Sequence, residues 1–207
     1  MTHAHNPWLG EQETPLVPVP PPVLPPVTGP TAPQRGIPAP KLEDRLPIYT
    51  QEHAAPLWWL GAHGGAGETT LASLVPEWFA AGHGWPNTAG STPANVVLVA
   101  RSNSRGLRAA QAAATQWASN LVPNVTVLGL VILADSPRRP PVALRELAHL
   151  VGGGVPRTWN VGWIESWRAD PSPALTGTPS DVRRLIDDLT TIINHGAAGT
   201  RTRKGKK

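Results

Sequence analysis

The segment from Leu57 to Leu71 constrains the fold more than any other part of this sequence. Four apolar residues, Leu57-Trp-Trp-Leu60, predict a short buried strand, and the run Gly61-Ala-His-Gly-Gly-Ala-Gly67 follows at once. A helix is then expected from Thr69 to about Ala80, because apolar residues recur at helical spacing, although Pro76 lies within it. A strand, a glycine-rich turn and a helix in this order form a cradle for a phosphate, since glycine lets the backbone approach an anion closely.

Apolar strands alternate with helices in the rest of the chain. Strands are expected over 95–100, 125–134 and 157–164, helices over 104–119, 142–151 and 180–194, and a loop over 81–94. The strand at 95–100 is continuously apolar from Val96 to Ala100, as in a parallel sheet that is covered on both faces. The sequence therefore predicts an α/β fold, with a small, mostly parallel sheet of about four strands, flanking helices and disordered termini.

Two appendages flank the expected α/β domain, which spans residues 48–196. Of the 25 prolines, 13 precede residue 48, so residues 1–47 are expected to form a proline-rich disordered arm. Its run from Pro15 to Pro26 favours polyproline II, which is either a ligand for an aromatic groove on a partner or a spacer.

Residues 197–207 are expected to form a basic, disordered tail. The net charge of the chain is +4, but the first 199 residues alone carry −1, so the positive excess belongs to the tail. The tail is either a solubilising extension or a weak contact for DNA or an anionic membrane surface. The candidate polyanion contacts are Arg201, Arg203, Lys204, Lys206 and Lys207.

Several classes of protein are excluded or disfavoured. The chain has no cysteine, which excludes a disulfide scaffold, a cysteine-ligated zinc site, an iron–sulfur cluster and a thiol nucleophile. The seven histidines lack metal-ligand spacing, and no Gly-x-Ser-x-Gly elbow occurs. The longest apolar runs are about half of the ~20 residues that span a bilayer. A cytoplasmic protein without a transmembrane segment is expected.

The glycine-rich run also carries a resemblance to a known family. Ala62-His-Gly-Gly-Ala-Gly-Glu-Thr-Thr-Leu-Ala72 resembles the deviant Walker A loop of the MinD/ParA family of P-loop ATPases, whose consensus is K-G-G-x-G-K-T-T. The glycines and threonines match, whereas His63 and Glu68 stand where the family has lysines. Leu128–Asp135 is similar to the family strand that borders the nucleotide base. The resemblance implies a P-loop NTPase-like sandwich, with ATP and Mg²⁺ as ligands and Thr69 holding the metal. The nucleotide-binding residues that it implies are Gly64, Gly65, Ala66, Gly67, Glu68, Thr69, Thr70 and Asp135.

Charge limits what this loop is expected to do. A unit charge pair at ~4 Å and an effective dielectric constant of ~20 contributes about 4 kcal/mol, and Glu68 reverses its sign at the lysine position. No lysine occurs between residues 42 and 203, and no apolar run ending in aspartate precedes Val96. ATP hydrolysis is therefore not expected, and no residue is assigned a catalytic role. The preferred hypothesis is a degenerate, non-catalytic accessory or adaptor protein with weak or no nucleotide binding, in which the glycines serve the fold.

Two alternatives stay open. In the first, the chain is an active ATP-binding switch, and an arginine such as Arg101 or Arg105 replaces the loop lysine. In the second, it is a DNA-associated, partition-like protein that acts through its basic tail. Trp159, Trp163 and Trp167 recur every four residues and are either packing residues or a surface for a protein partner. A protein partner is expected at this tryptophan-rich end or at the proline-rich arm.

Overall fold

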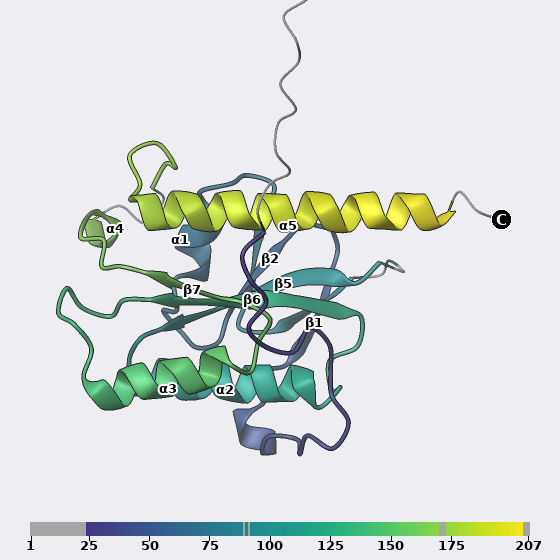
Figure 1. The fold of residues 1–207 in the computed structure, drawn as a ribbon, viewed down its shortest axis with the longest axis horizontal. Coiled ribbons are helices and arrows are strands. Elements are labelled where there is room, and N and C mark those ends of the chain that lie inside the picture. The colour runs from purple at the N-terminus through teal and green to yellow at the C-terminus, as the bar shows by residue number, and fades with distance from the viewer. Residues whose placement is uncertain (1–23, 89, 91, 170–172, 205–207) are drawn as a thin grey trace, which may run out of the picture.

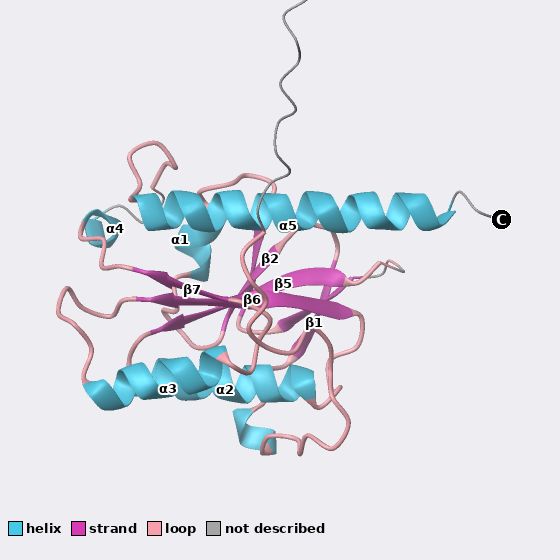
Figure 2. Cartoon of the chain, in the orientation of Figure 1, coloured by secondary structure: helices cyan, strands magenta, loops and turns pink. Residues whose placement is uncertain are grey.

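The computed structural model describes residues 24–88, 90, 92–169 and 173–204, with side chains up to residue 196. The predicted α/β class is confirmed, because a five-stranded sheet lies between two layers of helices (Figures 1 and 2). The strand order in this sheet is β3-β2-β5-β6-β7. A separate two-stranded sheet pairs β1 with β4. All of these strand pairs are parallel.

Strands and helices alternate from β5 to α4, whereas β1 and β2 and also β3, β4 and β5 follow one another directly. The strands are β1 (Ile48–Gln51), β2 (Trp58–Gly61), β3 (Phe79–Gly82), β4 (Trp85–Thr88), β5 (Ala94–Arg101), β6 (Val125–Leu133) and β7 (Thr158–Val161). The helices are α1 (Glu68–Ala72), α2 (Ser104–Ala118), α3 (Val142–Gly152), α4 (Ser166–Ala169) and α5 (Ser180–Lys204), with a 3₁₀ turn, η1, at Leu42–Asp44. Within the described residues, no helix is both long and apolar enough to cross a membrane.

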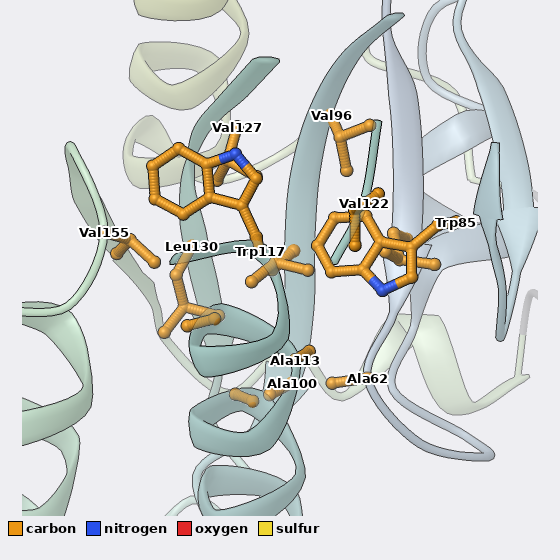
Figure 3. Packing of buried hydrophobic residues seen from close by; sticks show 14 of the residues in the cluster. Ala62, Trp85, Val96, Ala100, Ala113, Trp117, Val122, Val127, Leu130 and Val155 are labelled. Atoms are coloured by element: carbon orange, nitrogen blue, oxygen red, sulfur yellow. The ribbon is translucent and has the colours of Figure 1, made fainter. Parts of the chain in front are cut away.

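The helical layers explain why β5 is apolar from Val96 to Ala100. Val96 and Leu98 belong to the cluster beneath α2 and α3, whereas Val97 and Val99 belong to the cluster beneath α1 and α5. Successive side chains of a strand point to opposite faces, so a sheet that is covered on both sides needs apolar residues at every position. Figure 3 shows part of the first cluster, in which Trp85 and Trp117 are fully or almost fully buried.

The region after the glycine-rich run differs from its prediction. The helix expected over 69–80 ends at Ala72, and β3 begins at Phe79. Pro76 lacks the N–H that a continuing helix would need, which accounts for the early end. The expected loop at 81–94 contains the end of β3 and all of β4, so the described chain has more strands than the four expected.

The termini also differ from expectation. Part of the predicted arm, residues 24–47, contacts the body: the Thr28 amide donates to Pro156 O, and the Gln34 amide donates to Ala118 O, both at 2.9 Å. The rest of the arm, residues 1–23, lies outside the described residues. The last helix extends past residue 194 to Lys204. An interior glycine costs a helix only about 1 kcal/mol relative to alanine, so Gly196 does not have to end it.

Gln116 of α2 joins three segments of the structure. Its Oε1 accepts hydrogen bonds from the Leu46 amide at 2.9 Å and from Trp85 Nε1 at 3.1 Å, and its Nε2 donates to Leu46 O at 2.9 Å. The side chain is buried, and so is Trp85. One amide therefore fixes the end of the arm and β4 against α2.

We predict that Gln116→Ala lowers the free energy of unfolding by about 2 kcal/mol or more, because it leaves buried donors and an acceptor without partners. Gln111→Ala is the matched control, since Gln111 is exposed on the same helix. It should change stability by less than about 0.5 kcal/mol. Urea unfolding of both variants measures the difference. Equal, small losses would show that the Gln116 network does not hold the arm in place.

Candidate functional site

A cavity of about 510 Å³ opens where the carboxyl ends of β2, β5, β6 and β7 meet. In open parallel sheets, ligands bind outside the carboxyl ends of the strands, so this is the expected edge for a site. The residues that line it are His63, Gly64, Gly65, Gly67, Thr70, Arg101, Asn103, Arg105, Leu133, Asp135, Gly162, Trp163, Ile164, Trp167 and Arg168.

The glycine-rich loop forms one wall of this cavity. Gly67 has a φ of 104°, and a Cβ added there would lie 2.5 Å from Leu133 Cδ1, so only glycine fits. Gly65 has a φ of 74°, and nothing lies within 4 Å of the place of a Cβ at either Gly64 or Gly65. The backbone of these two residues is therefore not covered by neighbouring atoms.

His63 fixes the loop to the end of β5. Its Nε2 lies 3.1 Å from the Arg101 amide, which donates to it. The other ring nitrogen, Nδ1, must then carry the proton, and it donates to Gly64 O at 2.9 Å. Gly106 makes room for this contact, since a Cβ there would lie 2.7 Å from His63 Nε2. His63 is thus a positioning group for the loop.

Arginines supply the charge of the cavity. The Arg101 guanidinium bridges two walls, donating from Nε to Gly65 O at 3.3 Å and from Nη1 to Ala134 O at 3.2 Å. Arg105 lines the cavity from the first turn of α2, and Arg168 lines it from α4. Among the described lining residues, Asp135 is the only carboxylate, and the Glu165 carboxylate accepts a hydrogen bond from Nε1 of the lining Trp163 at 2.8 Å. The cavity is therefore cationic and suited to an anion.

Glu68 does not lie where the charge argument placed it. Its side chain is buried beneath the loop, and Oε2 accepts a hydrogen bond from the Gly67 amide at 3.1 Å. Its Oε1 lies 3.6 Å from Nδ1 of His83, on the side of β3. The space at Gly61 is needed here, because a Cβ there would lie 2.6 Å from Glu68 Oε2. Since the carboxylate faces away from the cavity, it does not oppose an anion bound there at close range.

Five of the predicted nucleotide-binding residues line the cavity: Gly64, Gly65, Gly67, Thr70 and Asp135. Ala66, Glu68 and Thr69 do not. Thr69, the predicted metal ligand, is exposed and does not line the cavity, whereas its neighbour Thr70 does. In the described residues, no group of three histidine or acidic side chains is arranged to hold a metal ion.

The tryptophans divide between packing and the cavity. Trp159 is buried and donates from Nε1 to Asp188 at 2.9 Å, so it is a packing residue of β7. Trp163 and Trp167 follow β7 and line the cavity, and the Arg168 guanidinium lies 5.7 Å from the Trp163 ring centroid. Sequence reasoning offered these two as packing residues or as a surface for a protein partner, and did not place them beside the glycine-rich loop. Their position just after a strand was the available signal.

The tail contacts proposed from the sequence cannot be placed in the site. Arg201, Arg203 and Lys204 lie in α5 beyond the residues whose side chains are described, and Lys206 and Lys207 lie outside the described residues.

The fold and the cavity together define an α/β protein with a cationic site at the carboxyl edge of a parallel sheet. A family model described as a family of unknown function (DUF6668) matches residues 55–186, which is more than half of the chain. The chain therefore belongs to this family. The matched range contains every residue that lines the cavity. No curated protein and no solved structure matches the chain.

We predict that Glu68→Lys destabilises the fold. The ammonium group would replace a buried carboxylate that accepts a hydrogen bond from the Gly67 amide. The space there is tight, because even a Cβ at Gly61 would lie 2.6 Å from Glu68 Oε2. The expected loss is about 2 kcal/mol or more in the free energy of unfolding, measured with urea. Glu77→Lys, at an exposed position, is the control with the same change of charge. Unchanged stability of Glu68→Lys would show that residue 68 is free to turn into the cavity.

Proposed function

We propose that this protein is a degenerate, non-catalytic P-loop-like protein that binds a phosphorylated ligand of the nucleotide type in the cavity at the sheet edge. The observation that carries the proposal is that Arg101, Arg105 and Arg168 line the cavity that also exposes Gly64 and Gly65, while Glu68 is buried outside its lining. The resemblance of the loop to the MinD/ParA family makes ATP the first ligand to test.

The arginines compensate for the missing lysines of the loop. Arg101 contacts Gly65 O, so its guanidinium already lies at the loop that would hold the phosphates. A guanidinium is always charged and pairs with phosphate oxygens through two parallel hydrogen bonds. The two open glycines can contribute backbone N–H groups to the same anion. Strong anion binding therefore does not depend on a lysine at residue 68.

The opposite wall supports a nucleotide rather than free phosphate. Trp163, Ile164 and Trp167 bring aromatic and apolar surface into a cavity whose other wall is cationic. Stacking of a base on an aromatic ring contributes about 1–3 kcal/mol in nucleic-acid binding proteins. A ligand that carries both phosphates and a flat ring complements both walls.

The same lining argues against phosphoryl transfer. Such catalysis needs groups that anchor a metal ion and position the attacking nucleophile. Asp135 is the only carboxylate among the described lining residues, and the exposed Thr69 lies outside the lining. We therefore propose an accessory or adaptor role, in which ligand occupancy affects a protein partner at the proline-rich arm or the tryptophan-rich end.

A second candidate is the ATP-hydrolysing switch, which the place of Arg101 beside the loop favours. It would need Asp135 or Thr70 to hold Mg²⁺. Phosphate release from ATP separates this candidate from the non-catalytic one. DNA binding through the tail stays a further alternative, because the tail side chains lie outside the described residues.

We predict that the full chain binds ATP with and without Mg²⁺, and that Arg105→Gln weakens binding about tenfold, which is ~1.4 kcal/mol. Arg105 is exposed and lines the cavity, so its loss removes one charge that attracts the phosphates. Isothermal titration calorimetry measures the affinity, and an assay of phosphate release is expected to show no turnover.

Arg108→Gln is the matched control, because Arg108 is exposed on the same helix but lies outside the cavity lining. It should leave the affinity within about twofold of the starting protein, since an exposed charge outside the cavity is largely screened by salt. An equal loss in both variants would mean that ATP is attracted by general positive charge. No binding at millimolar ATP would refute the proposed function.

A further inference from the structure

The walls of the cavity follow the strand order of the sheet. The glycine loop comes after β2, Arg101 ends β5, Asp135 follows β6, and Trp163 follows β7. These four strands are neighbours in the order β2-β5-β6-β7, and neighbouring strands lie ~4.8 Å apart. The groups at their ends therefore succeed one another across the cavity. Asp135 lies between the cationic wall with the glycine loop and the aromatic wall.

Hydrogen bonds fix Asp135 in this place. Its amide donates to Oγ of Ser102, which follows β5, at 3.0 Å. The preceding carbonyl, Ala134 O, accepts from Nη1 of Arg101 at 3.2 Å, and Nε of the same guanidinium donates to Gly65 O at 3.3 Å. The guanidinium thus lies between the glycine loop and the segment that carries Asp135. A phosphate held at the loop and the arginine is on one side of this residue.

Asp135 also differs in chemistry from the other polar side chains of the cavity. The three arginines of the lining only donate hydrogen bonds. Asn103 Oδ1 already accepts from the Gly106 amide at 2.8 Å, and both ring nitrogens of His63 contact backbone groups. Among the described lining side chains, the Asp135 carboxylate is the group that only accepts. The part of a ligand that lies beside it must therefore supply donors.

The aromatic wall on the other side of Asp135 is held in place by its own contacts. Trp163 donates from Nε1 to Glu165 Oε2 at 2.8 Å, and the Arg168 guanidinium lies 5.7 Å from the Trp163 ring centroid. A base that stacks at this wall leaves the phosphates to the glycine loop at the opposite wall. The sugar of a nucleotide joins the base to the phosphates, so it then lies beside Asp135.

We propose that Asp135 determines the sugar specificity of the site by accepting hydrogen bonds from the 2′- and 3′-hydroxyl groups of a ribose. The inference rests on the proposed function, since it takes a phosphorylated nucleotide as the ligand, and it narrows that ligand to a ribonucleotide. Hydrogen bonds to a carboxylate are stronger than those between neutral groups. The negative charge also repels phosphates from this part of the cavity, which leaves them to the arginines.

Isothermal titration calorimetry on the full chain, with ATP and with 2′,3′-dideoxy-ATP, tests this role. We expect ATP to bind about tenfold more tightly than the dideoxy analogue, because the analogue lacks both donors to the carboxylate. Asp135→Ala should lower this ratio to about twofold or less, since neither ligand then has the acceptor. The affinity for the analogue should not fall in this variant, because a charge that repels phosphates has been removed.

Asp187→Ala is the matched control, because Asp187 is an exposed aspartate of α5 outside the cavity lining. It should leave the ratio between the two ligands unchanged. Equal affinities for both ligands in the full chain, or an unchanged ratio in Asp135→Ala, would overturn the inference and leave the proposed function standing.

Titrations with and without Mg²⁺ separate a sugar contact from a metal contact. An equal loss of affinity for both ligands in Asp135→Ala, seen only with Mg²⁺, would overturn the inference, because Asp135 would then hold the metal ion. No binding of ATP to the full chain at millimolar concentration would refute the proposed function, and the sugar specificity with it.

Discussion

Every strand of the central sheet runs in the same direction, so the residues that follow β2, β5, β6 and β7 lie along one edge. The glycine loop, Arg101, Asp135 and the segment after β7 are far apart in the chain, yet they surround one cavity for this reason. The His63–Arg101 hydrogen bond then fixes the loop to its neighbouring strand. Parallel pairing thus creates the site, and local contacts shape it.

The side chain at residue 68 and the residues around the loop have different roles from those in the loop that this sequence resembles. The residue at the lysine position, Glu68, supports the loop from below through Gly67, and positive charge comes from Arg101 and Arg105, outside the loop. A lysine placed at residue 68 would enter the buried space beneath the loop. The positive charge of the cavity therefore depends on the assembled sheet edge, and the loop sequence alone does not show it.

Sequence patterns predicted the parallel α/β fold and most of the strand and helix positions, because continuous apolar runs and helical periodicity report burial directly. They did not predict that Glu68 turns away or that Arg168 reaches the cavity, since side-chain direction and convergence depend on tertiary packing. The contact of residues 24–47 with the body was missed for a similar reason. Proline content favours an extended backbone, but it does not show that the Gln116 side chain on α2 forms hydrogen bonds with the backbone of Leu46.

The most direct test of the account is a crystal structure of the full chain with a non-hydrolysable ATP analogue. The account predicts phosphate oxygens within hydrogen-bond distance of Arg101 and Arg105 and of the Gly64–Gly65 backbone, with the Glu68 carboxylate still bound to the Gly67 amide. A nucleotide held elsewhere on the molecule, or a Glu68 side chain turned into the cavity, would contradict it.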